Sequence, residues 1–112
     1  MAGKFFILEN KLESRKIPLS NIYYFEKIKG THTTCVVYVD GISTIKSDLR
    51  EILPRLDNDF IQCHKSFIVN VAMIRRIVKF RTYSILHFDN NVSCPCSNKY
   101  RKGVLEKWKY QA

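Results

Sequence analysis

The sequence predicts a mostly β domain made of short antiparallel strands, with one or two short helices. Three observations lead to this prediction. Apolar residues recur mainly with a period of two, the period at which the side chains of a strand return to the same face. Turn-forming pairs such as Asp40-Gly41 separate these runs. Apolar residues at helical spacing occur in only two segments.

Three apolar runs and one hairpin signal describe the first half of the chain. Phe5–Leu8 has the composition of a strand, and Ile22–Ile28 is rich in aromatic and β-branched residues. Thr33–Val39 predicts another strand, and Asp40-Gly41 predicts a tight turn into Ile42–Ile45. These segments predict an antiparallel arrangement joined by short loops.

A short helix is predicted next. Ser47 is a suitable N-cap, and Pro54 limits the helix to a few residues. Four apolar residues at helical spacing form its buried side: Leu49, Ile52, Leu53 and Leu56.

The second half of the chain again predicts strands. Phe67–Val69 is a short apolar strand, and Met73–Phe80 and Ser84–Phe88 have the pattern of hairpin partners. Asp89–Asn91 predicts a turn into a last strand, Val92–Cys96.

A helix near the C-terminus is predicted from an apolar stripe. Tyr100, Val104 and Trp108 recur at intervals of four residues opposite lysines, although Gly103 weakens the helix. We expect Trp108 to pack the C-terminal segment. Five further aromatic residues are predicted to belong to the core rather than to stack on bases: Tyr23, Tyr24, Phe25, Tyr83 and Phe88.

Length and composition indicate one folded domain over residues 1–112. The hydrophobic fraction of 46% and the aromatic fraction of 12% exclude disorder as the main state. No apolar run approaches the roughly 20 residues that span a membrane, and the first residues lack a signal-peptide cleavage site. The cytoplasm is therefore the expected location.

The net charge of +9 indicates a polyanionic partner. The positive charge is concentrated in residues 73–81 and 97–112. A basic surface of this kind favours nucleic acid over a membrane or an acidic protein, and solubility is the simpler alternative.

The cysteines do not form a recognisable metal or disulfide motif. Their spacing contains no C-x-x-C pair, and a chain without a secretory segment predicts no disulfide framework. We predict no metal and no cofactor, although one conceivable metal cluster would join His32, Cys63, His64, Cys94 and Cys96.

Motifs of enzymes are almost absent, so we predict that the protein is not an enzyme. The pair with nucleophile chemistry is Cys63-His64, but adjacent side chains on a strand point to opposite faces and cannot form a dyad.

The segment Phe60–Asn70 resembles the signature of LytTR-type DNA-binding domains: an aromatic residue, Arg, then His and Ser at alternate positions, then an apolar strand ending in Val-Asn. The surrounding elements are similar as well. Ile22–Glu26 resembles the early strand of the family and Leu49–Leu56 its single helix. Phe88–Asn91 and Pro95–Tyr100 resemble its last hairpin and loop.

The resemblance runs from about residue 4 to residue 104, which we take as the core of the domain, with a basic tail or helix over residues 99–112. It implies an elongated stack of small antiparallel β-sheets that reads double-stranded DNA with loops in the major groove. It also implies the output domain of a bacterial response regulator in a two-component system. The expected partners are DNA carrying direct repeats and a receiver domain in the full-length protein, with the isolated domain monomeric and paired on bent DNA.

The resemblance places base contacts in three loops, at His32, Lys65 and Asn98. Lys65 can donate to guanine O6 and N7, whereas Asn98 prefers adenine and stands where several members carry Arg. Gln62 replaces the usual Arg of the signature. Contacts to the DNA backbone are implied for seven residues: Thr31, Thr33, His64, Ser66, Ser97, Lys99 and Arg101.

Each of these residues also has a simpler structural interpretation. His32 can be a turn residue, His64 a core histidine, and Asn98 the cap of the last helix. Ser66 and Asn70 can close local turns.

Two further hypotheses concern function. Cys63 beside His64 and Lys65 is a possible redox site if it lies at the DNA surface. The alternatives to a transcription regulator are a single-stranded nucleic-acid-binding β module, which needs exposed aromatic residues on a basic sheet, and a small thiol- or metal-dependent hydrolase.

Overall fold

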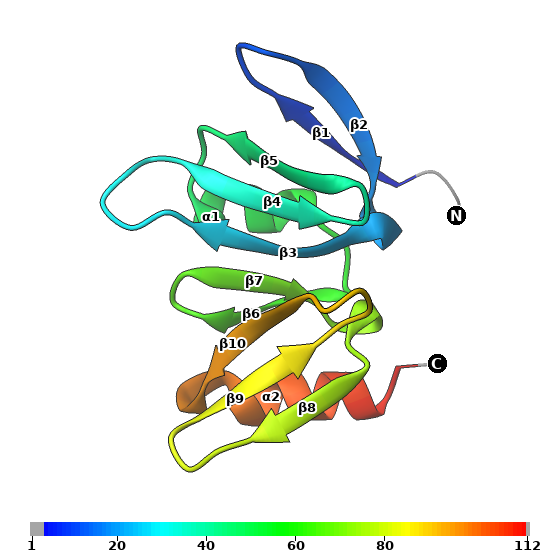
Figure 1. The fold of residues 1–112 in the computed structure, drawn as a ribbon, viewed down its shortest axis with the longest axis vertical. Helices are drawn as coiled ribbons and strands as arrows, with labels where there is room; N and C mark the ends of the chain where they lie inside the picture. Colours follow the sequence, from blue (N-terminus) through cyan, green and yellow to red (C-terminus); the bar gives the residue numbers. More distant parts are fainter. Residues whose placement is uncertain (1–3, 112) are drawn as a thin grey trace.

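The computed structural model describes residues 4–111, which form three antiparallel sheets stacked along the longest axis of the molecule (Figure 1). The predicted fold class is confirmed. The ends of the predicted domain, residues 1–3 and Ala112, lie outside the described residues. No helix within residues 4–111 has both the length and the apolar character needed to cross a bilayer.

The strands in chain order are β1 (Phe5–Glu9), β2 (Ser14–Pro18), β3 (Ile22–Lys27), β4 (Thr34–Tyr38), β5 (Gly41–Ile45), β6 (Phe60–His64), β7 (Phe67–Asn70), β8 (Arg76–Lys79), β9 (Tyr83–His87) and β10 (Ser93–Ser97). The α-helices are α1 (Leu49–Ile52) and α2 (Asn98–Lys109). Short 3-10 helices are η1 (Leu19–Asn21), η2 (Leu53–Arg55) and η3 (Val71–Met73).

The central sheet has the strand order β5-β4-β3-β7-β6. Its middle strand, β3, pairs on both sides, so that Phe25 lies opposite Val36 of β4 and Ile68 of β7. The β1–β2 hairpin forms a separate sheet, and the third sheet has the order β10-β9-β8.

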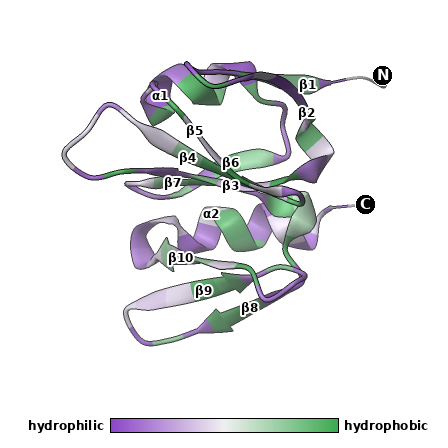
Figure 2. Ribbon diagram, turned by 45° about the horizontal axis from the view of Figure 1, so that its top comes forward, coloured by the Kyte–Doolittle hydropathy of each residue, from purple (hydrophilic) through white to green (hydrophobic). Residues whose placement is uncertain are grey.

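The central sheet is covered by apolar residues on both faces. One face packs against the β1–β2 hairpin and α1 in a cluster that includes Phe6, Phe25, Val36, Ile52 and Ile68. The opposite face packs against the third sheet and α2, in a cluster that includes Val37, Val69, Leu86, Cys94 and Val104. Figure 2 shows hydrophobic segments, coloured green, in the strands and in both α-helices. Because side chains alternate between two apolar cores, the sheet is a rigid support for the loops at its ends.

The first α-helix begins one residue later than the sequence indicates. The N-cap is Asp48 and not Ser47. Glu51 explains this difference, because its carboxylate accepts a hydrogen bond from the Asp48 N–H at 2.8 Å, in the manner of a capping box. As predicted, Pro54 limits the α-helix: the chain tightens into η2 and leaves the helix after residue 55.

The C-terminal helix is confirmed and has 12 residues. Val104 is buried, and Trp108 anchors the helix because its Nε1–H donates to the Ile74 carbonyl at 3.0 Å. Gly103 lies inside the helix without ending it. The prediction for Tyr83 is wrong, because this residue is 44% exposed at the end of the β8–β9 hairpin.

Candidate nucleic-acid interface

One edge of the molecule gathers the loops that contain the predicted DNA contacts. In Figure 1, the β3–β4 loop, the β6–β7 turn and the start of α2 lie at the same side, together with the β8–β9 hairpin turn. Antiparallel pairing explains this arrangement, because β3 and β6 run toward the same edge of the central sheet and β10 delivers α2 there. The loop that contains His32, the turn that contains Lys65 and the start of α2, which contains Asn98, therefore lie along one edge, although 66 positions separate His32 from Asn98.

The β3–β4 loop is closed by its own hydrogen bonds. Gly30 adopts a φ of 77°, which a side chain would disfavour. The Thr31 hydroxyl donates to the Ile28 carbonyl at 2.8 Å and accepts from the Thr33 N–H at 3.1 Å. Thr31 is thus occupied in shaping the loop, and His32 projects from its end with 62% of its side chain exposed.

His32 is surrounded by charged groups from the start of α1. Its Nδ1 lies 3.0 Å from Oδ2 of Asp48, and its Nε2 lies 3.6 Å from Oε1 of Glu51. Lys27, at the end of β3, holds the other oxygen of Asp48 at 3.1 Å. The hydrogen bond from Lys27, reinforced by the charge of His32, lowers the pKa of Asp48. The Asp48 N–H and the Ser47 hydroxyl, with the charge of His32, lower the pKa of Glu51.

The β6–β7 turn presents Lys65 to solvent on a hydrogen-bonded frame. The Gln62 amide donates to the carbonyls of His64 and Lys65 at 3.1 and 3.4 Å. The Ser66 N–H donates to Nδ1 of His64 at 3.0 Å, and the Ser66 carbonyl accepts from the Lys27 N–H at 2.8 Å. Gln62 therefore has a structural role at the position where the family signature has Arg.

The hydrogen bond from the Ser66 N–H also determines the tautomer of the neutral His64 ring. Since Nδ1 accepts a hydrogen bond, the proton of the neutral ring is on Nε2. The ring is partly exposed and meets Phe67 edge-on at 5.3 Å. Asn70 is buried and has a structural role. Its side-chain Nδ2 donates to the carbonyls of Leu19 and Ile22, and its Oδ1 accepts from the Ala72 N–H.

The β10–α2 junction exposes Asn98 and Lys99 in the first turn of a helix. Ser97 is the N-cap and Asn98 the first helical residue, so Asn98 is not the cap. The first turn contains no acidic residue, and the free N–H groups of a helix N-terminus favour anions.

Arg101 joins α2 to the β8–β9 hairpin. Its Nη2 donates to the carbonyls of Phe80 and Tyr83 at 2.5 and 2.7 Å. The two aromatic rings stack with centroids 4.9 Å apart and are both exposed. Arg101 therefore has a structural role within the protein, and a contact with the DNA backbone stays a prediction.

Cys63 does not lie at the surface, as the redox hypothesis requires. It is fully buried beside Cys94 and Cys96, and its Sγ lies 3.4 Å from the Pro95 carbonyl. Burial raises the pKa of Cys94 well above its usual value and that of Cys96 to about 11. The redox hypothesis requires Cys63 at the DNA surface, and this premise is wrong. Side chains alternate between the two faces of a strand, and the side chain of Cys63 points into the core.

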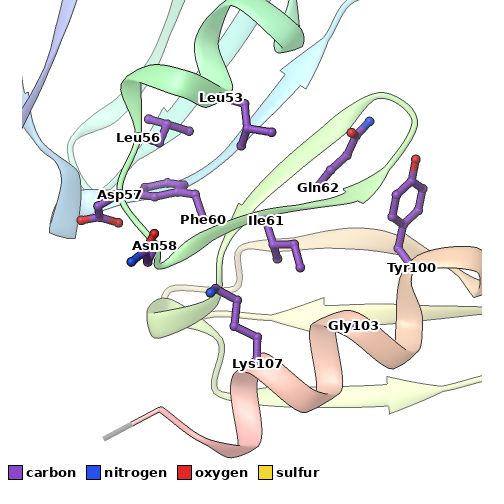
Figure 3. A pocket seen from close by; sticks show the side chains of 10 residues that line it. All are labelled: Leu53, Leu56, Asp57, Asn58, Phe60, Ile61, Gln62, Tyr100, Gly103 and Lys107. Carbon is purple, nitrogen blue, oxygen red and sulfur yellow. The ribbon is translucent and has the colours of Figure 1, made fainter.

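Within residues 4–111, the predicted histidine and cysteine ligands do not come together as a metal cluster. Among the described residues, the donors close enough to share an ion are His32, Asp48 and Glu51, and this group contains no cysteine. Lys27 already binds Asp48 there. A groove of about 460 Å³ lies between η2, β6 and α2 (Figure 3) and is lined by neither cysteine nor histidine.

Sequence reasoning missed the carboxylates beside His32 and the exposed hairpin turn. The spacing of Asp48 and Glu51, an acid followed three residues later by Glu, is a capping-box signal that identifies the helix start. No sequence signal indicates that this helix start meets the β3–β4 loop.

Two comparisons with known proteins found similar domains. A family model described as the LytTr DNA-binding domain matches residues 13–109. A solved structure is similar over 97% of this chain and 100% of the other, with 28% identity and a TM-score of 0.82. It is described as the LytTr DNA-binding domain of a putative methyl-accepting/DNA response regulator from Bacillus cereus. No curated protein matched the sequence.

Proposed function

The chain belongs to the LytTR family of DNA-binding domains, and from this premise we propose that it binds double-stranded DNA sequence-specifically as the output domain of a bacterial transcription regulator. Membership of the family supports DNA binding in a transcription regulator. The sequence-specific reading of direct repeats by the three loops is our proposal for this chain.

The observation that carries the proposal is the position of the three loops. Segments that lie far apart in the sequence meet at one edge, where Lys65, Asn98 and Lys99 are exposed. The Gln62 side chain bonds the turn of Lys65, and Asn98 and Lys99 belong to the first turn of α2. An edge of rigid loops with free cationic and amide groups is suited to the major groove and its flanking phosphates.

The side chains divide into two proposed roles. His32, Lys65 and Asn98 read bases, because each projects from its loop into solvent. Phosphates are met by the other predicted residues: Thr31, Thr33, His64, Ser66, Ser97, Lys99 and Arg101. For His64 the donor is Nε2–H, since Nδ1 is already bonded.

The shortest extent of the domain is smaller than one turn of DNA, which supports two copies on neighbouring sites if this axis lies along the DNA. The molecule measures 41 × 36 × 26 Å, and one turn of B-DNA advances about 34–36 Å. Two copies fit side by side on one face of DNA if their sites are about one helical turn apart. We further propose that a receiver domain controls the domain in a cytoplasmic two-component system.

The experiment that tests the proposal is selection of sites from a random pool of duplex DNA, followed by fluorescence anisotropy at two salt concentrations. We expect a repeated motif and an affinity that falls by about 0.9 log unit per contacted phosphate for each tenfold increase in salt. Matched single strands serve as competitors. The absence of a motif, together with better competition by single strands, would support the alternative β module.

A further inference from the structure

His32 has an unusual setting for an exposed side chain, because each of its two ring nitrogens faces a different carboxylate. Nδ1 lies 3.0 Å from Asp48 Oδ2, a hydrogen-bond distance, whereas Nε2 lies 3.6 Å from Glu51 Oε1, which is too long for one. The two nitrogens are therefore not equivalent.

Asp48 is held in place independently of His32. It is the N-cap of α1, its N–H donates to Glu51, and its second oxygen contacts Lys27 at 3.1 Å. Lys27 itself belongs to β3 of the central sheet. The carboxylate is thus a fixed acceptor, and its lowered pKa keeps it ionised at neutral pH.

A fixed ionised acceptor determines where the proton of the imidazole lies. An ionised carboxylate cannot donate, so the 3.0 Å contact between Asp48 Oδ2 and Nδ1 favours a proton on that nitrogen. This holds for the neutral and the charged ring alike. Nε2 is then the atom that changes, as an acceptor in the neutral ring and a donor in the charged ring.

Glu51 does not form a hydrogen bond with Nε2 of His32, so this nitrogen is available to contact a base. Its Oε1 already accepts from the Asp48 N–H at 2.8 Å and from the Ser47 hydroxyl at 3.2 Å. The charged groups that face His32 among the described residues are Asp48 and Glu51, with Lys27 behind Asp48.

We propose that Asp48 is a positioning residue that fixes the tautomer of His32 and thereby determines which base His32 reads. This inference rests on the proposed function. The neutral ring accepts from the exocyclic amine of adenine or cytosine, and the charged ring donates to guanine or to thymine O4.

Two substitutions of Asp48 separate positioning from charge. Asp48→Asn retains an oxygen that accepts from Nδ1 and is a good N-cap, whereas Asp48→Ser is a good N-cap too short to reach the ring. Both remove one negative charge, so both should bind all DNA more tightly to a similar degree. Only Asp48→Ser should alter base preference.

The binding test uses duplexes that differ at one base pair, chosen as the position where His32→Ala loses its preference. At about pH 8, the wild type and Asp48→Asn should favour the amine-presenting base by about two- to tenfold, and Asp48→Ser should show no preference. If Asp48→Ser keeps the wild-type preference, or if Asp48→Asn loses it, the inference is overturned while DNA recognition stands. The absence of any selected motif would instead reject the proposed function.

A second measurement needs no DNA and reads the tautomer directly. Imidazole ¹⁵N chemical shifts at high pH should show His32 with its proton on Nδ1 in the wild type and a mixture in Asp48→Ser. His64 is an internal reference of the opposite kind, because its Nδ1 accepts from Ser66. A wild-type His32 with its proton on Nε2 would overturn the inference.

Discussion

Local hydrogen bonds shape the segments that carry His32 and Lys65, whereas Asn98 is positioned by the start of a helix. The Thr31 hydroxyl closes the loop of His32, the Gln62 amide bonds the turn of Lys65, and Asn98 is the first residue of α2. In all three segments the predicted base-reading side chain is exposed. The loops are therefore largely ordered before DNA binds, which reduces the entropy lost on association.

Lys65→Ala should weaken binding to the selected site by about 1–3 kcal/mol and relax base preference at one position, because its ammonium group is free to donate to a base. Anisotropy on matched duplexes measures both effects. The control is Lys109→Ala, which removes an equal charge at the far end of α2 (Figure 1). Equal losses for the two variants would show that Lys65 contributes only general electrostatic attraction.

Asp48 should contribute to stability at neutral pH and lose this contribution in acid. Its pKa in the folded protein is lowered, first by Lys27, so the stabilisation is complete above the unfolded pKa of about 4 and decreases as the pH falls toward the folded pKa. Urea unfolding of the wild type and Asp48→Asn should therefore show a larger difference at pH 7 than at about pH 3. A difference that is independent of pH would contradict an ionic origin.

At the scale of elements, hairpins and helices were predictable where local signals are strong. A tight turn follows β4 as expected, but it is formed by Val39 and Asp40, and Gly41 begins β5. Asp89–Asn91 forms a turn as expected, with Asn90 and Asn91 at positive φ. The β2 strand was missed because its residues 14–16 are polar and exposed. The contact between His32 and Asp48 was not predictable, because it depends on how β5 returns the chain to the β3–β4 loop.

Substitution by alanine should change the free energy of unfolding in opposite directions at Gly103, inside a helix, and at Gly30, in a loop with positive φ. In α2, a Cβ at Gly103 would meet Ile61 Cδ1 at 3.8 Å, an ordinary contact, so Gly103→Ala should raise the free energy of unfolding by about 0.5–1 kcal/mol. Gly30→Ala should lower it by about 1 kcal/mol, because φ is +77° there. Urea unfolding checks both values, and destabilisation by Gly103→Ala would contradict the described packing of α2 on β6.

At the scale of the whole molecule, two buried cores make one rigid body out of three small sheets. The interface loops extend from the central sheet and from α2, and the second core joins these two elements. The sequence resemblance was sufficient to place the loops, because the order of strands determines which loops share an edge. The contacts of Arg101 with the hairpin depend on tertiary packing and could not be read from spacing.

The orientation of the selected repeats should reveal how two copies bind. A symmetric dimer places its subunits about a two-fold axis and selects inverted repeats, whereas copies bound head to tail select direct repeats. We expect the 13.2 kDa chain to sediment as a monomer alone and to form a 2:1 complex on duplexes with direct repeats. Insertion of about five base pairs rotates the second site to the opposite face of the DNA and should abolish cooperative binding, while single-site affinity is unchanged. Selection of inverted repeats, or a dimer without DNA, would contradict the head-to-tail arrangement.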